Sequence, residues 1–388
     1  MRFATAIPNF SRSKGGAERY LVDLCARMAE EGHEVHVYAE RWEEEIPGIS
    51  LHRVKTIPFP KSLRLLSFAI KATREIKKGN YDVTLGVGNT LEADVIQPHG
   101  GVHWAWFWRS LQAYGNPLVW LIKFFGRVLS PKQWAQGYIE SIPYKKKSFK
   151  KIIAISDMVK RDMIRWYKVP EDRIVVIYNG VDTERFHPRN RQYRDEIRRK
   201  LSIGDEFVML FVSNNFRMKG LVFLMKALAD LKKEGAPPFK LLVLGRDRKA
   251  PYLCLAKKIN ISEEMVFAGS TNEPEKYYGA TDLFIHPAFY DAFSLTVLEA
   301  LASGLPVITT SSTGASEVLN HGKDGFVIRS IRDLEELKVG VRYFLKENIR
   351  HQASHLGRRK AEMHSDKINF SAITQVFKDT INACPPKK

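Results

Sequence analysis

Two acidic residues, Asp291 and Glu299, stand eight positions apart in the segment HPAFYDAFSLTVLEALASGLPVITT. The apolar run 283–285 predicts a strand before Asp291, and the pattern after it predicts a helix that holds Glu299 about one turn inside. Both carboxylates can therefore face one cleft. The question is which ligand lies between them.

Phosphate-binding features follow two other predicted strands, and ligands of open α/β sheets bind beyond the carboxyl ends of strands. Arg217 and Lys219 in SNNFRMKG suit a diphosphate, the arginine as a fork and the lysine as a point charge. Gly15 and Gly16 in SRSKGGAER precede a predicted helix, where backbone amides could approach a phosphate. A glycine pair by itself is more often a plain tight turn.

The acidic segment itself predicts a third phosphate contact. Ser294, Leu295 and Thr296 form the first turn of the expected helix, with Ser294 as its N-cap. Because two carboxylates would repel a diphosphate, we expect them to accept hydroxyls of a sugar and a ribose while cations and the helix dipole hold the phosphates. This pattern indicates a nucleotide-sugar site. The alternative is a loop acid and a solvated helix residue.

Short apolar strands alternate with helical stretches along all 388 residues, which predicts two doubly wound, Rossmann-like α/β domains with parallel sheets. We expect an acceptor-binding domain at 1–185, a nucleotide-sugar-binding domain at 186–365, and a C-terminal helix at 366–388 that returns to the first domain. The composition is globular, with 44% hydrophobic and 27% charged residues. Three cysteines without pairing or metal spacing favour a reducing cytoplasm. The net charge of +18 favours anionic partners or a diffusely basic surface.

Several motifs in order resemble the retaining GT-B glycosyltransferases of family 4: GGAER, ISDMVKRDM, NGVDTERF, FRMKG and YDAFSLTVLEALASGLPVITTSSTGASEVL. Within that family the chain is most similar to lipopolysaccharide core α-1,3-glucosyltransferases. The resemblance implies two domains facing across a cleft, retention of configuration, and UDP-glucose as the favoured donor. It also places Glu299 on the ribose and Asp291 on the donor sugar, with Phe293 beside them in the donor site.

Three positions depart from the family pattern. Asp291 replaces a glutamate and Ser294 replaces a glycine. Met218 stands where FGRKG-type motifs have arginine, and Arg217 can compensate from one position earlier. These departures leave the identity of the donor sugar open.

His99 is the remaining catalytic candidate, because it follows the predicted strand 94–97 in PHGGVHWAW. The resemblance implies that a residue at this strand end contacts the donor sugar near the reacting carbon, with His103 as the second choice. A plain structural histidine is the alternative. The sequence contains no Asp-x-Asp pair, so we expect no metal and no cofactor beyond the nucleotide sugar, which is a co-substrate.

The segment 100–151 interleaves aromatic and basic residues, which suits the headgroup region of an anionic bilayer. The expected membrane contacts are Trp104, Trp106, Trp108, Trp120, Lys145, Lys146 and Lys147. A local core or a dimer surface would explain the aromatic residues equally. No nucleic-acid module is recognisable, and no stretch is long and apolar enough to span a bilayer.

The sequence thus predicts an enzyme that moves a hexose or heptose to a lipid-linked saccharide such as the lipopolysaccharide core. We expect it in the cytoplasm, peripheral on the inner leaflet of the bacterial inner membrane. The alternatives are a family 4 transferase with a soluble acceptor, of the sucrose-phosphate synthase type, another cell-envelope mannosyl or GlcNAc transferase, and a non-catalytic binding protein. The oligomeric state stays open.

Overall fold

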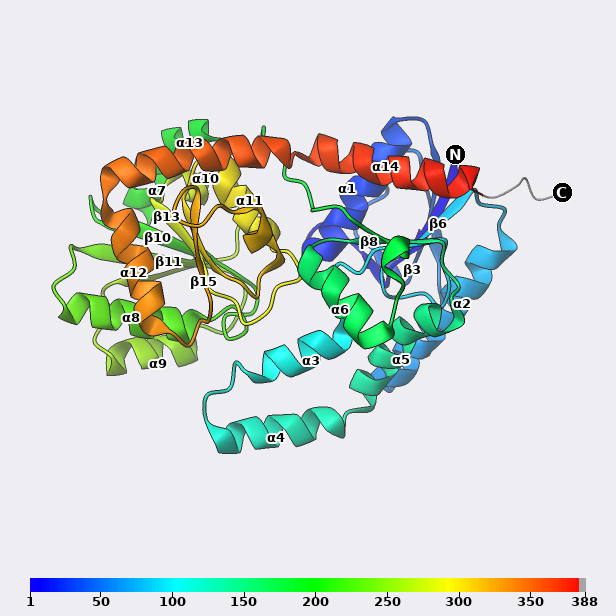
Figure 1. The fold of residues 1–388 in the computed structure, drawn as a ribbon, viewed down its shortest axis with the longest axis horizontal. Helices are drawn as coiled ribbons and strands as arrows, with labels where there is room; N and C mark the ends of the chain where they lie inside the picture. The colour runs from blue at the N-terminus through cyan, green and yellow to red at the C-terminus, as the bar shows by residue number, and fades with distance from the viewer. Residues whose placement is uncertain (384–388) are drawn as a thin grey trace. The chain divides into compact units, whose positions relative to one another are not determined.

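A computed structural model describes residues 1–383 as two compact units. Of these residues, the first unit comprises 1–178 and 370–383, and the second comprises 179–369 (Figure 1). Both are built on wholly parallel sheets. The doubly wound, Rossmann-like fold expected for each half is therefore confirmed. The last five residues of the expected helix 366–388, which include Cys384, lie outside the described residues.

The sheet of the first unit has seven strands in the order β5-β3-β1-β6-β7-β8-β9. Their bounds are β1 Arg2–Ala6, β3 Glu34–Ala39, β5 Ile49–Arg53, β6 Val83–Gly86, β7 Val95–Ile96, β8 Lys151–Ala154 and β9 Ile174–Val176. The short strands β2 (Asn9–Phe10) and β4 (Arg41–Trp42) pair separately. The helices are α1 Gly16–Glu30, α2 Lys61–Lys78, α3 His103–Leu111, α4 Pro117–Val128, α5 Pro131–Lys146 and α6 Asp157–Tyr167, with a 3₁₀ turn at Glu171–Arg173.

The core of the first unit explains why helix α1 forms where it does. Leu21, Leu24, Cys25 and Met28 recur at helical spacing and are all buried, so the helix presents one apolar face to the sheet. The C-terminal helix α14 (Asp366–Asn382) buries part of its surface in the same core. Its contributions there are Phe370, Ile373 and Phe377.

The sheet of the second unit has six strands in the order β12-β11-β10-β13-β14-β15. Their bounds are β10 Phe207–Val212, β11 Phe239–Leu244, β12 Met265–Gly269, β13 Leu283–His286, β14 Val307–Thr310 and β15 Gly325–Ile328. The helices are α7 Arg194–Lys200, α8 Leu221–Lys233, α9 Ala250–Lys258, α10 Pro274–Gly279, α11 Leu295–Ala302, α12 Leu334–Leu345 and α13 Glu347–Met363, with 3₁₀ turns at Pro188–Tyr193 and Gly314–Val318.

The two units meet in sequence at Tyr178 and Asn179, whereas the sequence placed the seam at 185/186. Residues after Asn179 already pack on the second unit. Val181 forms a β-bridge with Ser365, and Arg185 donates to the Glu275 carboxylate at 2.9 Å. These contacts attach residues 179–185 to the second unit.

Candidate active site

The strand order of the second sheet defines where a ligand should bind. From β10 the chain proceeds to β11 and β12 on one side, and then returns to β13 on the other side of β10. The loops that follow β10 and β13 therefore run in opposite directions from adjacent carboxyl ends, which is the switch point where α/β sheets bind ligands. The first loop carries Arg217 and Lys219, and the second carries Asp291.

An ion pair joins these two loops. The Lys219 ammonium lies 2.5 Å from Asp291 Oδ2 and donates to the Tyr290 carbonyl oxygen at 3.1 Å. His286, the last residue of β13, lies with Nε2 3.0 Å from the same Oδ2. The side chains of Lys219 and Asp291 are each only 19% exposed. Lys219 and Asp291, predicted separately as phosphate and sugar contacts, thus contact each other.

The ionisation of this group follows from its surroundings. Burial raises the pKa of Asp291, but the charge of Lys219 and the hydrogen bond from His286 outweigh burial and hold that pKa well below its usual range. Burial also lowers the pKa of His286, against the opposing effect of Asp291. The arrangement is therefore an ionised carboxylate between an ammonium and a neutral imidazole.

A glycine permits the close approach of the two loops. Gly220 begins helix α8 with a φ of 82°, and a β-carbon there would lie 2.2 Å from the carbonyl oxygen of Pro287. The Phe289 amide donates to the Met218 carbonyl oxygen at 3.1 Å, which ties the loops by their backbones. A side chain at position 220 would therefore force at least one of the two loops to shift.

The start of helix α11 differs from the prediction at Ser294. This residue occupies the N-cap position, but its side chain makes no capping hydrogen bond, and its hydroxyl lies 3.0 Å from that of Thr296 instead. The reason is its backbone: Ser294 has a φ of 80°, in a region that glycine adopts without strain. The capping role expected for the Ser294 side chain is therefore wrong.

Glu299 lies in helix α11 and is half-buried. The buried Tyr278 hydroxyl donates to Glu299 Oε2 at 2.9 Å, so helix α10 orients this carboxylate. Neither Tyr278 nor His286 was predicted as a supporting residue. A histidine directly after an apolar strand, five residues before the acid, was the only available signal for His286.

In the first unit, His99 follows strand β7 and is half-buried against Tyr20, with ring centroids 4.2 Å apart. Its Nε2 is buried and has no hydrogen-bond partner among the described residues. Burial lowers the pKa of His99 to about 3, so the ring is neutral. A neutral, desolvated imidazole at a strand end can accept or donate one hydrogen bond to a ligand.

His103, the second choice, also has a buried Nε2 without a hydrogen-bond partner among the described residues. Its backbone amide begins helix α3 and donates to Glu140 Oε1 at 2.9 Å, and its ring is buried. Burial raises the pKa of Glu140 to about 7, and Tyr167 also donates to this carboxyl group at 2.9 Å. Glu140 thus anchors the start of helix α3, four residues after His99.

Gly15 is the N-cap of helix α1 and has extended backbone, with φ of −170°. A β-carbon at Gly15 would lie 2.6 Å from Glu18 Oε2, so the absence of a side chain lets this carboxylate fold over the helix start. Gly16 is the first helical residue. Across residues 1–383, no group of three or more His, Cys, Asp or Glu side chains has the geometry to hold a metal ion.

Two family models match the chain in succession. "Glycosyltransferase Family 4" matches residues 14–185, and "Glycosyl transferases group 1" matches residues 193–362. Together they cover the strand-end loops of both units. The chain belongs to the GT-B glycosyltransferases.

Relatives of this glycosyltransferase are distant but nearly full-length. It is 27% identical over 337 residues to an uncharacterised glycosyltransferase, MJ1607, of Methanocaldococcus jannaschii, covering 81% of each chain. It is 24% identical to the lipopolysaccharide glucosyltransferase WaaG of Escherichia coli, covering 87% of this chain and 91% of WaaG. The crystal structure of WaaG matches with a TM-score of 0.80 at 21% identity, over 97% of this chain and 99% of WaaG.

The aromatic and basic segment of the glycosyltransferase forms helices α3, α4 and α5. Trp104 packs against Trp134 with ring centroids 5.3 Å apart, and Trp106 lies under the Arg127 guanidinium at 5.1 Å. Trp120 stacks on Phe124, whereas Trp108 is 46% exposed. Several of these aromatic side chains therefore pack against one another within helices α3–α5, as in the local core considered as the alternative to membrane contact.

Helix α4 is the exception, because none of its residues is buried. Arg127 faces α3, where it donates to the Phe107 carbonyl oxygen at 3.1 Å, and Lys123 lies 5.9 Å from the Tyr114 ring. The opposite side is apolar and 45–76% exposed. We call it the α4 face, and it comprises Leu118, Leu121, Ile122, Phe125 and Leu129. No helix in the described part of the chain is long and apolar enough to cross a membrane.

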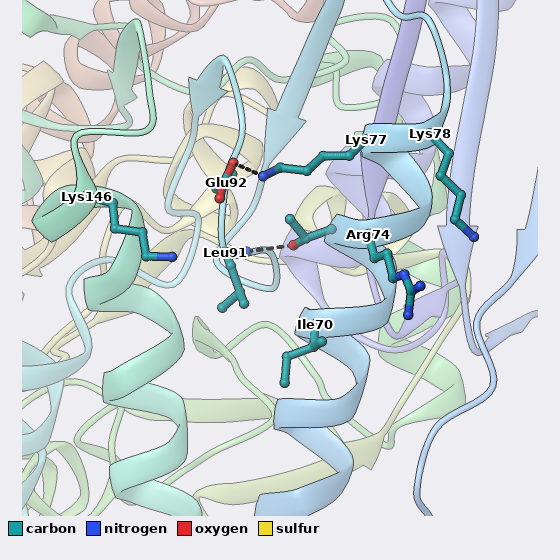
Figure 2. A pocket seen from close by; sticks show the side chains of 8 residues that line it. Ile70, Arg74, Lys77, Lys78, Leu91, Glu92 and Lys146 are labelled. Carbon is teal, nitrogen blue, oxygen red and sulfur yellow. Dashed lines mark hydrogen bonds and ion pairs between the residues drawn. The ribbon is translucent and has the colours of Figure 1, made fainter.

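One cavity of about 360 Å³ lies between helices α2 and α5 of the first unit (Figure 2). Lys77 extends from α2 to Glu92 at 2.5 Å, and Lys146 approaches from α5. Both helices end here with lysines in their last turns. Cations stabilise the negative end of a helix dipole, which accounts for the basic lining without a ligand.

Proposed function

We propose that this glycosyltransferase moves a hexose or heptose from a nucleoside-diphosphate sugar to a lipid-linked saccharide. The observation that carries the proposal is the Lys219–Asp291 contact at the switch point of the second sheet. It brings a phosphate-binding cation and a hydroxyl-binding acid to one place, as a nucleotide sugar requires.

Each site residue has a role in this proposal. Arg217, Lys219 and the amides of the first turn of α11 hold the diphosphate, and this positive charge makes a metal ion unnecessary. The turn comprises Ser294, Leu295 and Thr296. Full turnover in excess chelator is expected, and loss of turnover that added Mg²⁺ or Mn²⁺ restores would contradict the metal-free proposal.

The carboxylates bind hydroxyls. Asp291, beside Phe293, accepts a hydroxyl of the donor sugar, and Glu299, oriented by Tyr278, accepts the ribose. Gly15 and Gly16 bring the backbone amides at the start of α1 to the donor phosphates, which requires the Glu18 carboxylate to turn away from the helix start. His99 contacts the donor sugar near the reacting carbon. The reaction retains the configuration of that carbon, and the leaving phosphate accepts the proton of the acceptor hydroxyl.

UDP-glucose is the favoured donor. The solved relative HepE of Anabaena, with a TM-score of 0.72 at 17% identity over 99% of this chain, is described in complex with UDP-glucose. WaaG is named as a lipopolysaccharide glucosyltransferase. The test is a product assay across UDP-glucose, UDP-galactose, UDP-N-acetylglucosamine, GDP-mannose and ADP-heptose, in which UDP-glucose should give the highest kcat/KM. Binding of all five without turnover would instead identify a non-catalytic protein.

The α4 face supports a lipid-linked acceptor and attachment to the inner leaflet of the bacterial inner membrane, on the cytoplasmic side. An exposed apolar helix face on a chain with a net charge of +18 suits an anionic bilayer surface. The expected basic contacts Lys145, Lys146 and Lys147 are exposed at the C-terminal end of helix α5. Trp108 and Trp120 add aromatic surface at the border of the α4 face.

Vesicle co-sedimentation tests this attachment. Ile122→Glu with Phe125→Glu should abolish binding to vesicles of phosphatidylglycerol and phosphatidylethanolamine. The matched control is Val339→Glu, which changes a residue 49% exposed on α12 and should leave binding unchanged. Unaltered binding by the double variant would favour a soluble acceptor, as in the sucrose-phosphate synthase that this fold also matches with a TM-score of 0.77.

A further inference from the structure

We propose that His286 is the positioning residue that turns the Asp291 carboxylate so that one oxygen, Oδ1, is left for a hydroxyl of the donor sugar. The inference rests on the proposed function of Asp291 and deepens it. His286 ends strand β13 and is 2% exposed, so its side chain is held by the core. Among the described residues, the hydrogen-bond partner of its side chain is Asp291, whose Oδ2 lies 3.0 Å from Nε2.

The direction of this hydrogen bond follows from the charges. Asp291 is ionised and accepts, and His286 is neutral because burial lowers its pKa. A neutral imidazole carries one proton, and the nitrogen facing the carboxylate must carry it. Nδ1 is therefore the unprotonated nitrogen, which agrees with its being buried without a hydrogen-bond partner among the described residues.

The two carboxylate oxygens of Asp291 have different surroundings. Oδ2 accepts from Lys219 at 2.5 Å and from His286 at 3.0 Å. Oδ1 accepts only a long contact of 3.4 Å from the Phe293 amide among the described residues. The oxygen with unused acceptor capacity is therefore Oδ1, and the donors on Oδ2 fix where it points.

His286 becomes decisive once a diphosphate is present. A diphosphate carries more negative charge than a carboxylate and competes for the Lys219 ammonium. If Lys219 shifts toward it, His286 is the donor that still holds Oδ2. The histidine cannot itself turn to the ligand, because its ring is enclosed and stacked on Phe284 with an interplanar angle of 12°.

Two substitutions at His286 separate positioning from packing. His286→Leu removes the donor and keeps much of the volume, and His286→Gln keeps an N–H donor. At metal sites, loss of a residue that orients a ligating side chain typically costs about 10- to 100-fold in affinity or activity, and we apply the same range to a residue that orients a sugar-binding carboxylate. We expect His286→Leu to lower kcat/KM for the preferred nucleotide sugar by about that factor, while its Kd for the free nucleoside diphosphate stays within about twofold. His286→Gln should recover kcat/KM to within about fivefold.

The matched control is Thr309→Val. Thr309 donates to the His286 carbonyl oxygen at 2.8 Å and does not contact Asp291, so the variant disturbs the same core without removing the donor. Both kcat/KM and the nucleoside diphosphate Kd should change little. The proposal is overturned if His286→Leu weakens nucleotide sugar and nucleoside diphosphate equally, if it weakens neither, or if His286→Gln shows no recovery.

A second measurement does not require turnover. Imidazole ¹⁵N chemical shifts of the full chain should show His286 as the neutral Nε2–H tautomer from pH 6 to 8. A neutral Nδ1–H tautomer or an imidazolium would overturn the proposal. If the wild-type chain uses no nucleotide sugar while the tautomer is as expected, the proposed function fails and the positioning of Asp291 stands.

Discussion

The ion pair between Lys219 and Asp291 should contribute measurably to the stability of the second unit. Asp291→Asn keeps the shape of the side chain but leaves the ammonium without its counter-charge, and Lys219→Met leaves the carboxylate with only the neutral His286. Both side chains are 19% exposed, between a surface pair and a fully buried one. The double variant removes both charges together.

The magnitude follows from that intermediate burial. Exposed pairs contribute about 0.2–1 kcal/mol, and removing one partner of a buried pair costs about 3–5 kcal/mol. We therefore expect each single variant to lose about 2–3 kcal/mol of unfolding free energy. The double variant should lose less than the sum, with a coupling energy of about 1.5–2.5 kcal/mol, because contacting charges are not additive.

Urea unfolding can assign the loss to the correct unit. All seven tryptophans precede residue 170, so tryptophan fluorescence reports on the first unit, while far-UV circular dichroism reports on both. The variants should shift the circular dichroism transition to lower urea and leave the fluorescence transition in place. A coupling energy below about 0.5 kcal/mol would refute the reasoning, because the pair would then behave as a solvated surface pair.

The pH dependence of the unfolding free energy tests independently whether Asp291 is stabilised in its ionised form. The folded pKa of Asp291 lies below its unfolded value near 4, so its contribution is complete above that value and is lost as the pH falls toward the folded pKa. Wild type should lose more stability than Asp291→Asn between about pH 5 and 3. Equal losses would show that Asp291 is not held ionised by Lys219 and His286.

Other variants probe the loops and the histidine of the first unit. Ser294→Gly should raise the midpoint of thermal unfolding or leave it unchanged. Relief of the positive φ should add about 1–2 kcal/mol to the free energy of unfolding, and loss of the hydroxyl contact with Thr296 should remove about 1 kcal/mol. Ser294→Ala keeps the strain and loses the contact, so it should lower the midpoint. Gly220→Ala should lower the free energy of unfolding in urea by at least about 2 kcal/mol and weaken nucleotide binding, because its β-carbon would collide with the Pro287 carbonyl oxygen. An unchanged unfolding midpoint would contradict that collision. Titration of His99 should cause no change in kcat/KM between pH 5 and 8, because burial lowers the pKa of His99 to about 3. A change in kcat/KM centred near pH 6.5 that His99→Asn abolishes would contradict this burial.

Much of the fold could be predicted from the sequence because its signals are local. Short, mostly apolar strands alternate with helices, and this pattern alone predicts parallel sheets. The acids Asp291 and Glu299 were also found by spacing, since the strand and helix around them are strongly patterned. Strand-end position then brought Lys219 to the same edge.

The contacts of the site were not predictable in the same way. Lys219 and Asp291 are 72 positions apart, and only the order of strands β10 and β13 makes them neighbours. Ser294 reads as a good N-cap by residue type, but a φ of 80° turns its hydroxyl away from the helix start. Backbone conformation overrode a side-chain preference there.

The α4 face shows a related difficulty. Interleaved cations and aromatic residues predicted that tryptophans and lysines would meet a membrane together. Instead, the Arg127 guanidinium packs on Trp106 and hydrogen-bonds to helix α3. The apolar side chains on the other side of α4, including Leu118, Ile122 and Phe125, are exposed. A hydropathy pattern gives the two faces of a helix but does not say which one the protein covers.

The same ion pair links stability to recognition in the proposed reaction. Without donor, Lys219 stabilises the charge of Asp291, and both loops are held in place. A diphosphate that draws Lys219 away must offset the coupling energy of about 2 kcal/mol, so free phosphate, with fewer contacts, should displace it poorly. A nucleotide sugar supplies the phosphates for Lys219 and a hydroxyl for Asp291 at once. Discrimination against partial ligands would then arise from a contact that must be broken before either half of the donor can bind fully.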